Sequence, residues 1–293
     1  MYKEQEFKKY LEVEKNSSAA TIKAYMADLH EYEAYIQSFN LNILACSADT
    51  IKKFLNKLKN EGKTGSTINR KSVSIRKYYE FLRFAGDIEN NPCTKLIVPK
   101  VETSDFKFLT IEQIEELLKQ PEDDDLGLRD KALLELLYAC GLKVTELVDL
   151  NVQDVDLRIG FVSCRGDKAK SRIIPMGHPA KDALLKYMKD IRGKFLSGKE
   201  DSGALFLNYN GERISRQGIW KIVKQYGQKA GISEDLGPQL IRNSFAAHMI
   251  QNGADLKSLQ ELLGNEDASI TKLFLALSKV RVMDVYDKTH PRA

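Results

Sequence analysis

The chain has 293 residues, enough for one large domain or for two of ordinary size. Lys and Arg total 45 against 41 Asp and Glu, so the net charge of +4 does not by itself indicate a partner. The longest apolar run, 136–140, is far shorter than the roughly 20 residues of a membrane-spanning helix. No basic start precedes an apolar core, so no signal peptide is expected. The 4 cysteines form no CxxC pair and the 4 histidines no HExxH motif, which argues against zinc. The composition predicts a cytoplasmic protein without a membrane partner, a metal site or a cofactor.

The first 85 residues predict a domain of four helices. Apolar and aromatic side chains recur at helical spacing over 2–15 and 18–37. A third helix is expected from about residue 49 to residue 61, and a fourth from Ser66 or Thr67 to Phe84.

Positive charge is concentrated on the last two of these helices. Residues 50–83 carry ten basic side chains against two acidic ones, whereas the rest of 1–105 has more acidic than basic side chains. This asymmetry predicts a cationic face for a polyanion, although a solvated lysine-rich helix surface explains it equally well. The candidate nucleic-acid contacts on this face are Lys52, Lys53, Lys57, Arg70, Lys71, Arg76 and Lys77.

A change in composition divides the chain after residue 85. Residues 86–105 contain Asn90-Asn91-Pro92 and Pro99, and proline restricts the residue before it to extended backbone. The sequence therefore predicts a linker over 86–105, between a helical domain over 1–85 and a second domain over 106–293.

The second domain is expected to combine helices with a small hairpin. Thr110 and Gln113 fit a capping box, and the nearly all-apolar segment 128–140 predicts a buried helix. Residues 159–164 and 171–176 have strand character on either side of a polar turn, which predicts an antiparallel pair. The remaining expectations are helices over 178–194 and 215–230, a short strand at 205–207, and four helices from 238 to the end.

Three segments in the second domain resemble the tyrosine recombinase (phage-integrase) family. CGLKVTELVDL at 140–150 is similar to the first signature box, and residues 236–267 are similar to the second. The tail SKVRVMDVYDKTHPRA resembles the C-terminus of Xer-type members. The resemblance implies a mostly α fold with a small antiparallel sheet, in which a helical core-binding domain and a mixed α/β catalytic-type domain form a C-shaped clamp on double-stranded DNA. It also implies chemistry without a cofactor.

In that family, a tyrosine hydroxyl attacks the scissile phosphate and forms a 3′-phosphotyrosyl bond. Two arginines and histidine-type donors stabilise the charge on the phosphate, and a hairpin lysine protonates the departing 5′-oxygen. Arginine suits this role because its planar fork reaches two phosphate oxygens at once.

Five of the six corresponding positions depart from the family pattern. Only the second arginine, Arg242, matches the pattern, and the nucleophile position is Phe274, which lacks the hydroxyl that would attack. The hairpin lysine position is Asp167, and the neighbouring Lys168 could cover its role in a remodelled turn. The other three departures are Lys143 for arginine, and Gln239 and Asn265 for histidines.

Two functions of different classes follow from these departures. The first is a DNA-binding protein that clamps a duplex without cleaving it. The second is an active recombinase that uses an unconventional site or a tyrosine supplied by a partner. Phe274 favours the first, since the neighbouring Leu273, Leu275 and Ala276 offer no replacement nucleophile. For either function the resemblance implies self-association, or pairing with an active recombinase, through a C-terminal helix at about 279–289.

Overall fold

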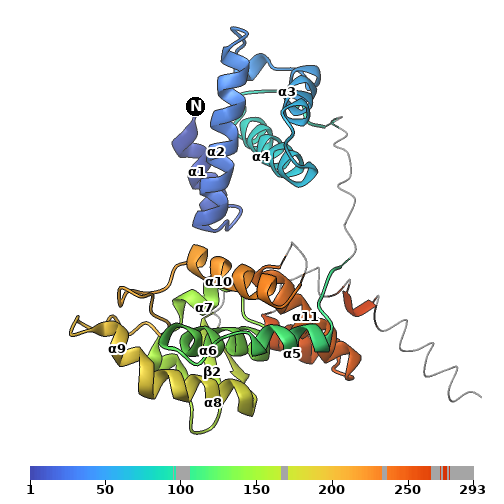
Figure 1. Ribbon diagram of the computed structural model, residues 1–293. Helices are drawn as coiled ribbons and strands as arrows, with labels where there is room; N and C mark the ends of the chain where they lie inside the picture. The colour runs from blue at the N-terminus through green and yellow to red at the C-terminus, as the bar shows by residue number, and fades with distance from the viewer. Residues whose placement is uncertain are drawn as a thin grey trace, which may run out of the picture. The chain divides into compact units, whose positions relative to one another are not determined.

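The computed structural model describes residues 1–94, 96, 106–165, 171–232, 236–264, 271, 273–275 and 277. The chain forms two compact units, Met1–Thr103 and Ser104–Ala293 (Figure 1). The predicted fold class is confirmed, because the described residues are mostly helical and contain a small antiparallel sheet. None of the described helices is long and apolar enough to cross a membrane.

The described part of unit 1 is built from four helices, and the last three begin at side-chain caps. The hydroxyl oxygens of Ser18, Ser47 and Thr64 each accept a hydrogen bond from the backbone N–H three residues later, which satisfies a donor at the first turn. A short 3-10 turn, η1 (Ile43–Ala45), separates the first helix pair from the second. The helices are α1 (Glu4–Val13), α2 (Ala19–Gln37), α3 (Ala48–Asn60) and α4 (Gly65–Phe84).

Aromatic side chains fill the core of unit 1. Tyr32 of α2 and Tyr79 of α4 are fully buried, and their hydroxyl oxygens are 3.2 Å apart. The Tyr79 hydroxyl also donates to the Ile43 carbonyl at 3.0 Å, so these buried polar atoms have partners. Cys93 and Leu96, which belong to the segment predicted as a linker, are buried in this same core.

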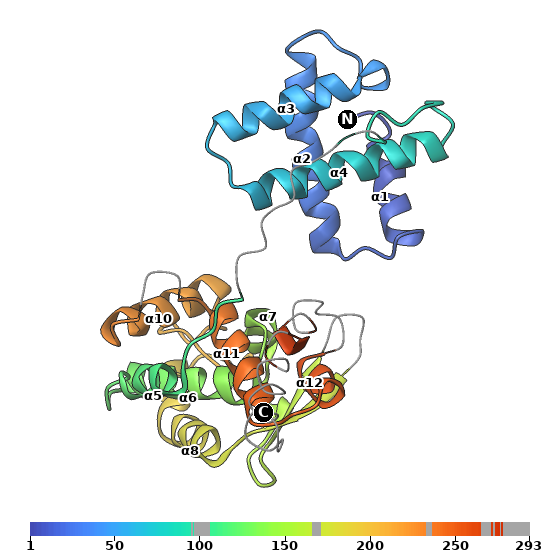
Figure 2. The same ribbon diagram turned by 90° about the vertical axis from the view of Figure 1, so that its right-hand side faces the viewer.

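Unit 2 surrounds one long buried helix, α6 (Asp125–Cys140), which packs against α8 and α11. Figure 2 shows α5 and α10 toward one side of α6, and α7 and α12 toward the other. The helices around α6 are α5 (Ile111–Lys119), α7 (Val144–Asp149), α8 (His178–Lys186), α9 (Arg192–Leu196), α10 (Arg216–Lys229), α11 (Pro238–Gln251) and α12 (Leu256–Leu263).

The sheet of unit 2 has the order β1-β2-β3 and is antiparallel throughout. It consists of β1 (Val155–Asp156), β2 (Phe161–Arg165) and β3 (Ser171–Pro175), and the 3-10 turn η2 (Val152–Asp154) precedes it. In the register of β2 and β3, Ser163 lies opposite Ile173. The hairpin predicted from residues 159–176 is therefore present, whereas its turn, 166–170, lies outside the described residues.

Two expectations about unit 2 are corrected. The helix predicted over 178–194 is interrupted by a π-helical segment, η4 (Tyr187–Ile191), which separates α8 from α9. The second concerns Trp220, the one tryptophan of the sequence, which we expected in the core because it is a large apolar residue, but which is 48% exposed. Its indole lies against Gly237, where an added Cβ would come within 2.4 Å of the ring, so the tryptophan covers a neighbouring backbone instead of filling the interior.

His248 of α11 is a buried histidine that makes stability depend on pH. Its Nε2 donates to the Leu109 carbonyl at 2.9 Å, and the Tyr138 hydroxyl donates to its Nδ1 at 3.0 Å. Burial lowers the pKa of His248 below its ordinary value of 6.5. The unfolded chain therefore binds the proton more readily than the folded chain, and the stability present above pH 6.5 is lost as the pH falls.

We expect His248→Gln to flatten the decrease in the free energy of unfolding between about pH 7.5 and pH 5.5, because glutamine at this buried position does not titrate. Urea unfolding at both pH values measures this decrease. His178→Gln is the control because His178 is exposed, as predicted, and its variant should keep the wild-type dependence. An unchanged pH dependence in His248→Gln would contradict the assignment.

Candidate functional site

Arg242 ties together two helix ends in unit 2. It lies on α11 and is only 2% exposed. Its Nη1 donates to the Gly141 carbonyl at 2.6 Å, and its Nη2 donates to the Leu263 carbonyl at 2.7 Å. Gly141 follows the last residue of α6, and Leu263 ends α12, so the guanidinium satisfies carbonyls that a helix end leaves without an intrahelical partner.

A buried ion pair lies beside Arg242. Both carboxylate oxygens of Glu146 accept hydrogen bonds from Arg172, from Nη1 at 2.7 Å and from Nη2 at 2.9 Å. The Nε of Arg172 donates to the Leu262 carbonyl at 2.7 Å, and the Nη1 of Arg242 lies 3.9 Å from Glu146 Oε2. Arg172 therefore joins β3, α7 and the end of α12. Burial lowers the pKa of its guanidinium, but the hydrogen bonds that it donates to Glu146 outweigh this effect and raise the pKa.

Lys143 comes directly before α7 and is half-buried. Its backbone N–H donates to Glu146 Oε2 at 2.8 Å, so the carboxylate that binds Arg172 also caps this helix. The structure thus brings the backbone of Lys143 and the guanidinium of Arg242 near the same carboxylate oxygen, Glu146 Oε2. Sequence reasoning did not assign a role to Glu146 or Arg172, because the two lie 26 positions apart and neither belongs to a local pattern that indicates the other.

Gln239 lies one turn before Arg242 on α11 and is exposed. Its amide nitrogen donates to Asn243 Oδ1 at 2.9 Å, and Asn243 in turn donates to the Lys107 carbonyl at 3.2 Å. The Gln239 amide is therefore linked through Asn243 to Lys107, near the start of unit 2.

Phe274 is half-buried and packs against a small apolar cluster in which Leu263 and Leu273 are buried. This agrees with the expectation that the ring has a packing role. Three positions implied by the resemblance, Asp167, Lys168 and Asn265, lie outside the described residues, as does the predicted C-terminal helix.

The predicted basic face of unit 1 divides into exposed and internally paired side chains. Lys52, Lys53 and Lys57 of α3 are exposed. Lys53 and Lys57 form ion pairs with Asp49 and Glu61 along the same helix, at 3.0 and 2.9 Å. Such exposed pairs contribute little to stability, so these ammonium groups remain available to an incoming anion.

The basic side chains of α4 are more constrained. Lys71 is buried and forms ion pairs with Asp28 and Glu31 of α2, at 3.0 and 2.7 Å. Arg70 binds the same Asp28 but is about half exposed. The prediction that Lys71 contacts nucleic acid is therefore wrong for the free protein. Lys71 precedes the buried Ile75 by one helical turn, and this position on the apolar face is a signal that could have indicated burial.

Arg76 and Lys77 are half-buried. The Nη2 of Arg76 is 3.5 Å from the Leu96 carbonyl, and its buried Nε has no hydrogen-bond partner among the described residues. Lys77 pairs with Glu80 at 2.8 Å. Neither side chain is as accessible as the lysines of α3.

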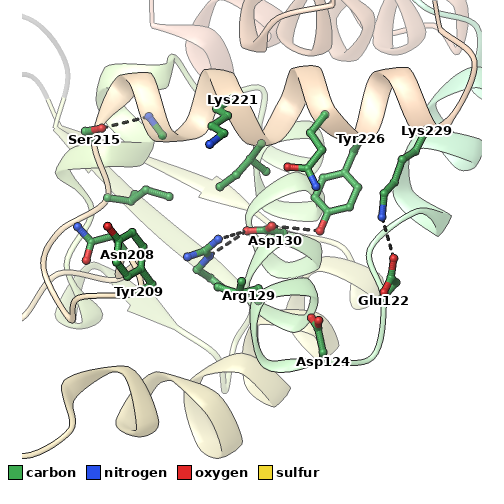
Figure 3. A pocket seen from close by; sticks show the side chains of 15 residues that line it. Glu122, Asp124, Arg129, Asp130, Asn208, Tyr209, Ser215, Lys221, Tyr226 and Lys229 are labelled. Carbon is green, nitrogen blue, oxygen red and sulfur yellow. Dashed lines mark hydrogen bonds and ion pairs between the residues drawn. The ribbon is translucent and has the colours of Figure 1, made fainter.

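A cavity of about 490 Å³ lies between the N-terminal part of α6 and α10 (Figure 3). Arg129 donates twice to Asp130 Oδ1, at 2.8 and 2.7 Å, and the Tyr226 hydroxyl donates to Asp130 Oδ2 at 3.1 Å. Burial raises the pKa of this carboxyl. Gly141 follows the other end of α6, 11 residues after Asp130, which is about 17 Å along the helix at 1.5 Å per residue. The cavity is therefore separate from the cluster around Arg242.

Comparison with known proteins places both units in one family. A model described as the phage integrase family matches residues 107–281, and one described as the phage integrase N-terminal SAM-like domain matches residues 5–86. The chain belongs to the phage integrase family.

Curated integrase-family relatives match along the whole chain. Tyrosine recombinase XerD of Listeria innocua is 39% identical over 294 residues, covering 98% of this chain and 98% of that protein. Tyrosine recombinase XerD of Oceanobacillus iheyensis is 38% identical, covering 100% of this chain and 99% of that protein.

A solved structure shares the fold of this integrase-family chain. It is the crystal structure of XerH site-specific recombinase bound to palindromic difH substrate, in a post-cleavage complex. Its TM-score is 0.73 at 18% identity, and the match covers 96% of this chain and 83% of that one. The predicted Xer-type resemblance is thus confirmed for both domains.

Proposed function

We propose that this integrase-family protein binds double-stranded DNA as a clamp and does not cleave it. The observation that carries the proposal is the phenylalanine at position 274, where the family pattern has its nucleophilic tyrosine. A phenyl ring has no group that can attack phosphorus, and it packs against the apolar cluster around Leu263 and Leu273. The decisive test is whether a covalent protein–DNA adduct forms on a nicked duplex.

The retained arginine supports the DNA-binding part of the proposal. The guanidinium of Arg242 is held by two backbone carbonyls, so its position does not depend on a bound phosphate. A cation fixed in this way is preorganised for an anion. The palindromic difH substrate to which XerH is bound in the matching structure supports a nucleic-acid phosphate as that anion. Lys143 would contribute a second positive charge near Arg242. Its backbone N–H donates to Glu146, the carboxylate that also lies 3.9 Å from Arg242 Nη1.

The proposal includes a protein partner. Residues 279–289, which lie outside the described residues, contain Val280, Val282, Met283 and Val285, enough apolar material for a helix that docks into a groove of a neighbouring subunit. The neighbour would be a second copy of this chain or an active recombinase of the same family.

The three exposed lysines of α3 should give DNA binding a steep dependence on salt. We expect replacement of Lys52, Lys53 and Lys57 by alanine to weaken binding to all duplex sequences and to reduce the salt slope, by about one for each lysine that contacts a phosphate. Titration of a labelled duplex at salt concentrations from about 50 to 200 mM measures both effects. Lys71 is left unchanged because its removal would take one of two cationic partners from the buried Asp28.

The matched control removes three exposed lysines of unit 2, Lys186, Lys189 and Lys194, and changes the net charge by the same amount. This control should keep the wild-type salt slope. Equal slopes for wild type and the α3 variant would show that these lysines do not contact phosphate.

A further inference from the structure

Asp28 is a buried carboxylate beneath the exposed surface of α4. It lies on α2 and is 1% exposed. It accepts hydrogen bonds from three side chains of α4: Lys71 Nζ at 3.0 Å, Ser74 Oγ at 2.8 Å, and Arg70 Nη1. One buried acid therefore fixes one end of the Arg70 guanidinium.

The charges of this cluster balance. Lys71 also pairs with Glu31 at 2.7 Å, so two basic side chains of α4 meet two carboxylates of α2. A phosphate is attracted mainly by net positive charge, which this cluster lacks. Hydrogen bonds to the edge of a neutral base do not depend on net charge in that way. The cluster is thus better suited to reading a base than to holding a phosphate.

The other edge of Arg70 faces outward. The side chain is 46% exposed, and within the described part of the chain its Nε and Nη2 donate no hydrogen bond. These two nitrogens form a planar pair of donors, which is the geometry that matches the O6 and N7 acceptors of guanine in the major groove.

The residues around Arg70 suit the same surface. Ser66 and Asn69 are exposed, and Val73 is half-buried one turn further along α4. No acidic side chain occurs from Thr64 to Tyr79, so nothing on this part of α4 repels DNA. Arginine, asparagine and a small apolar side chain on one helix face can contact guanine, adenine and the thymine methyl group respectively.

We propose that Arg70, held by Asp28, reads a guanine in the DNA site and so helps to determine sequence specificity. The inference rests on the proposed DNA-binding function and adds to it a residue that distinguishes one sequence from another. In this arrangement Asp28 is a positioning residue, and the lysines of α3 contribute affinity without sequence preference.

The test is selection of bound duplexes from a random library, followed by sequencing, with the full-length protein. We expect the wild type to enrich a motif that contains a guanine, and Arg70→Lys to lose preference at that position alone. The loss should be about 5- to 150-fold, the range for one bidentate base contact. Arg70→Lys keeps the charge and removes the fork, and as a half-exposed substitution it leaves the core unchanged.

Two further variants separate the outcomes. Lys52→Ala removes an exposed lysine of α3, so it should lower the affinity for every sequence equally and keep the enriched motif. Asp28→Asn, checked for folding by thermal unfolding, should weaken the same guanine preference as Arg70→Lys. An unchanged motif in Arg70→Lys, or a loss spread evenly over all positions, would overturn the inference and leave DNA binding intact. Retention of duplexes by the wild type without any enriched motif would also overturn the inference and leave DNA binding intact. Failure of the wild type to retain any duplex would instead contradict the proposed function itself.

Discussion

Wild-type protein incubated with a nicked duplex that carries its selected sequence is expected to give no adduct that survives denaturant, and Phe274→Tyr alone should not restore cleavage at a useful rate. The substitution returns the hydroxyl but leaves the surrounding positions as they are. Loss of a single preorganised donor from a site of this kind typically lowers the rate by about a hundredfold to a thousandfold.

Lys143, Gln239 and Asn265 each replace a family donor, and Asp167 adds a negative charge where the family pattern has a lysine. The penalties need not add, because groups that act as a unit lose function together. Recovery should require a combined variant, in which Phe274→Tyr is accompanied by Lys143→Arg, Gln239→His, Asn265→His, Asp167→Lys and Lys168→Gly.

Adduct formation is measured by denaturing electrophoresis of labelled DNA. The control is the combined variant with Phe274 left unchanged, which has the rebuilt pocket but no nucleophile and should give no adduct. An adduct formed by the wild type would refute the non-cleaving function, and mapping the modified residue would identify the actual nucleophile. An adduct formed by Phe274→Tyr alone would show that the other departures matter less than proposed.

The second large effect is expected from Arg172→Ala, which should reduce the free energy of unfolding of unit 2 by about 3–5 kcal/mol. The reason is that Glu146 would remain as a buried carboxylate without the bidentate hydrogen bonds from Arg172. Urea unfolding measures the loss, and because the chain has two units, the transition of unit 1 should not move.

Arg216→Ala provides the control, since Arg216 is an exposed arginine on α10 and its loss should change the unfolding free energy by less than about 0.5 kcal/mol. Replacement of both partners, Arg172→Met with Glu146→Leu, should recover part of the stability, because Glu146 is then no longer a buried carboxylate without Arg172. The recovery should be incomplete, because Arg242 loses the carboxylate that lies 3.9 Å from its Nη1. A loss below about 1 kcal/mol for Arg172→Ala would show that water replaces the arginine at the carboxylate.

Local patterns were sufficient to predict most of the helices and the hairpin. The nearly all-apolar segment of α6 is recognisable from its own residues. The same is true of the strand-like residues of β2 and β3. The start of α4 was placed slightly late because Gly65 is a weak helix former, although Thr64 caps the helix ahead of it. The π-helical segment after α8 has no comparable local signal.

Long-range pairing was the part that the sequence did not reveal. Lys71 was predicted to face DNA because it lies in a basic stretch, yet Asp28, 43 positions earlier, draws it into the interior. The position of Lys71 one turn before Ile75 could have indicated burial, but only the packing of α2 against α4 identifies the partner. In the same way, the family pattern indicated Arg242, whereas the carbonyls that hold it come from the ends of α6 and α12.

The contact between Trp220 and Gly237 gives the chain a built-in optical probe. Trp220 is the single tryptophan of the sequence, and its half-exposed indole covers the residue from which α11 begins. The same helix carries Gln239 and Arg242 within its first two turns. Tryptophan fluorescence therefore comes from one known position, next to the first residues of α11. A shift in the tryptophan emission on adding DNA would report a change at the start of this helix without a label.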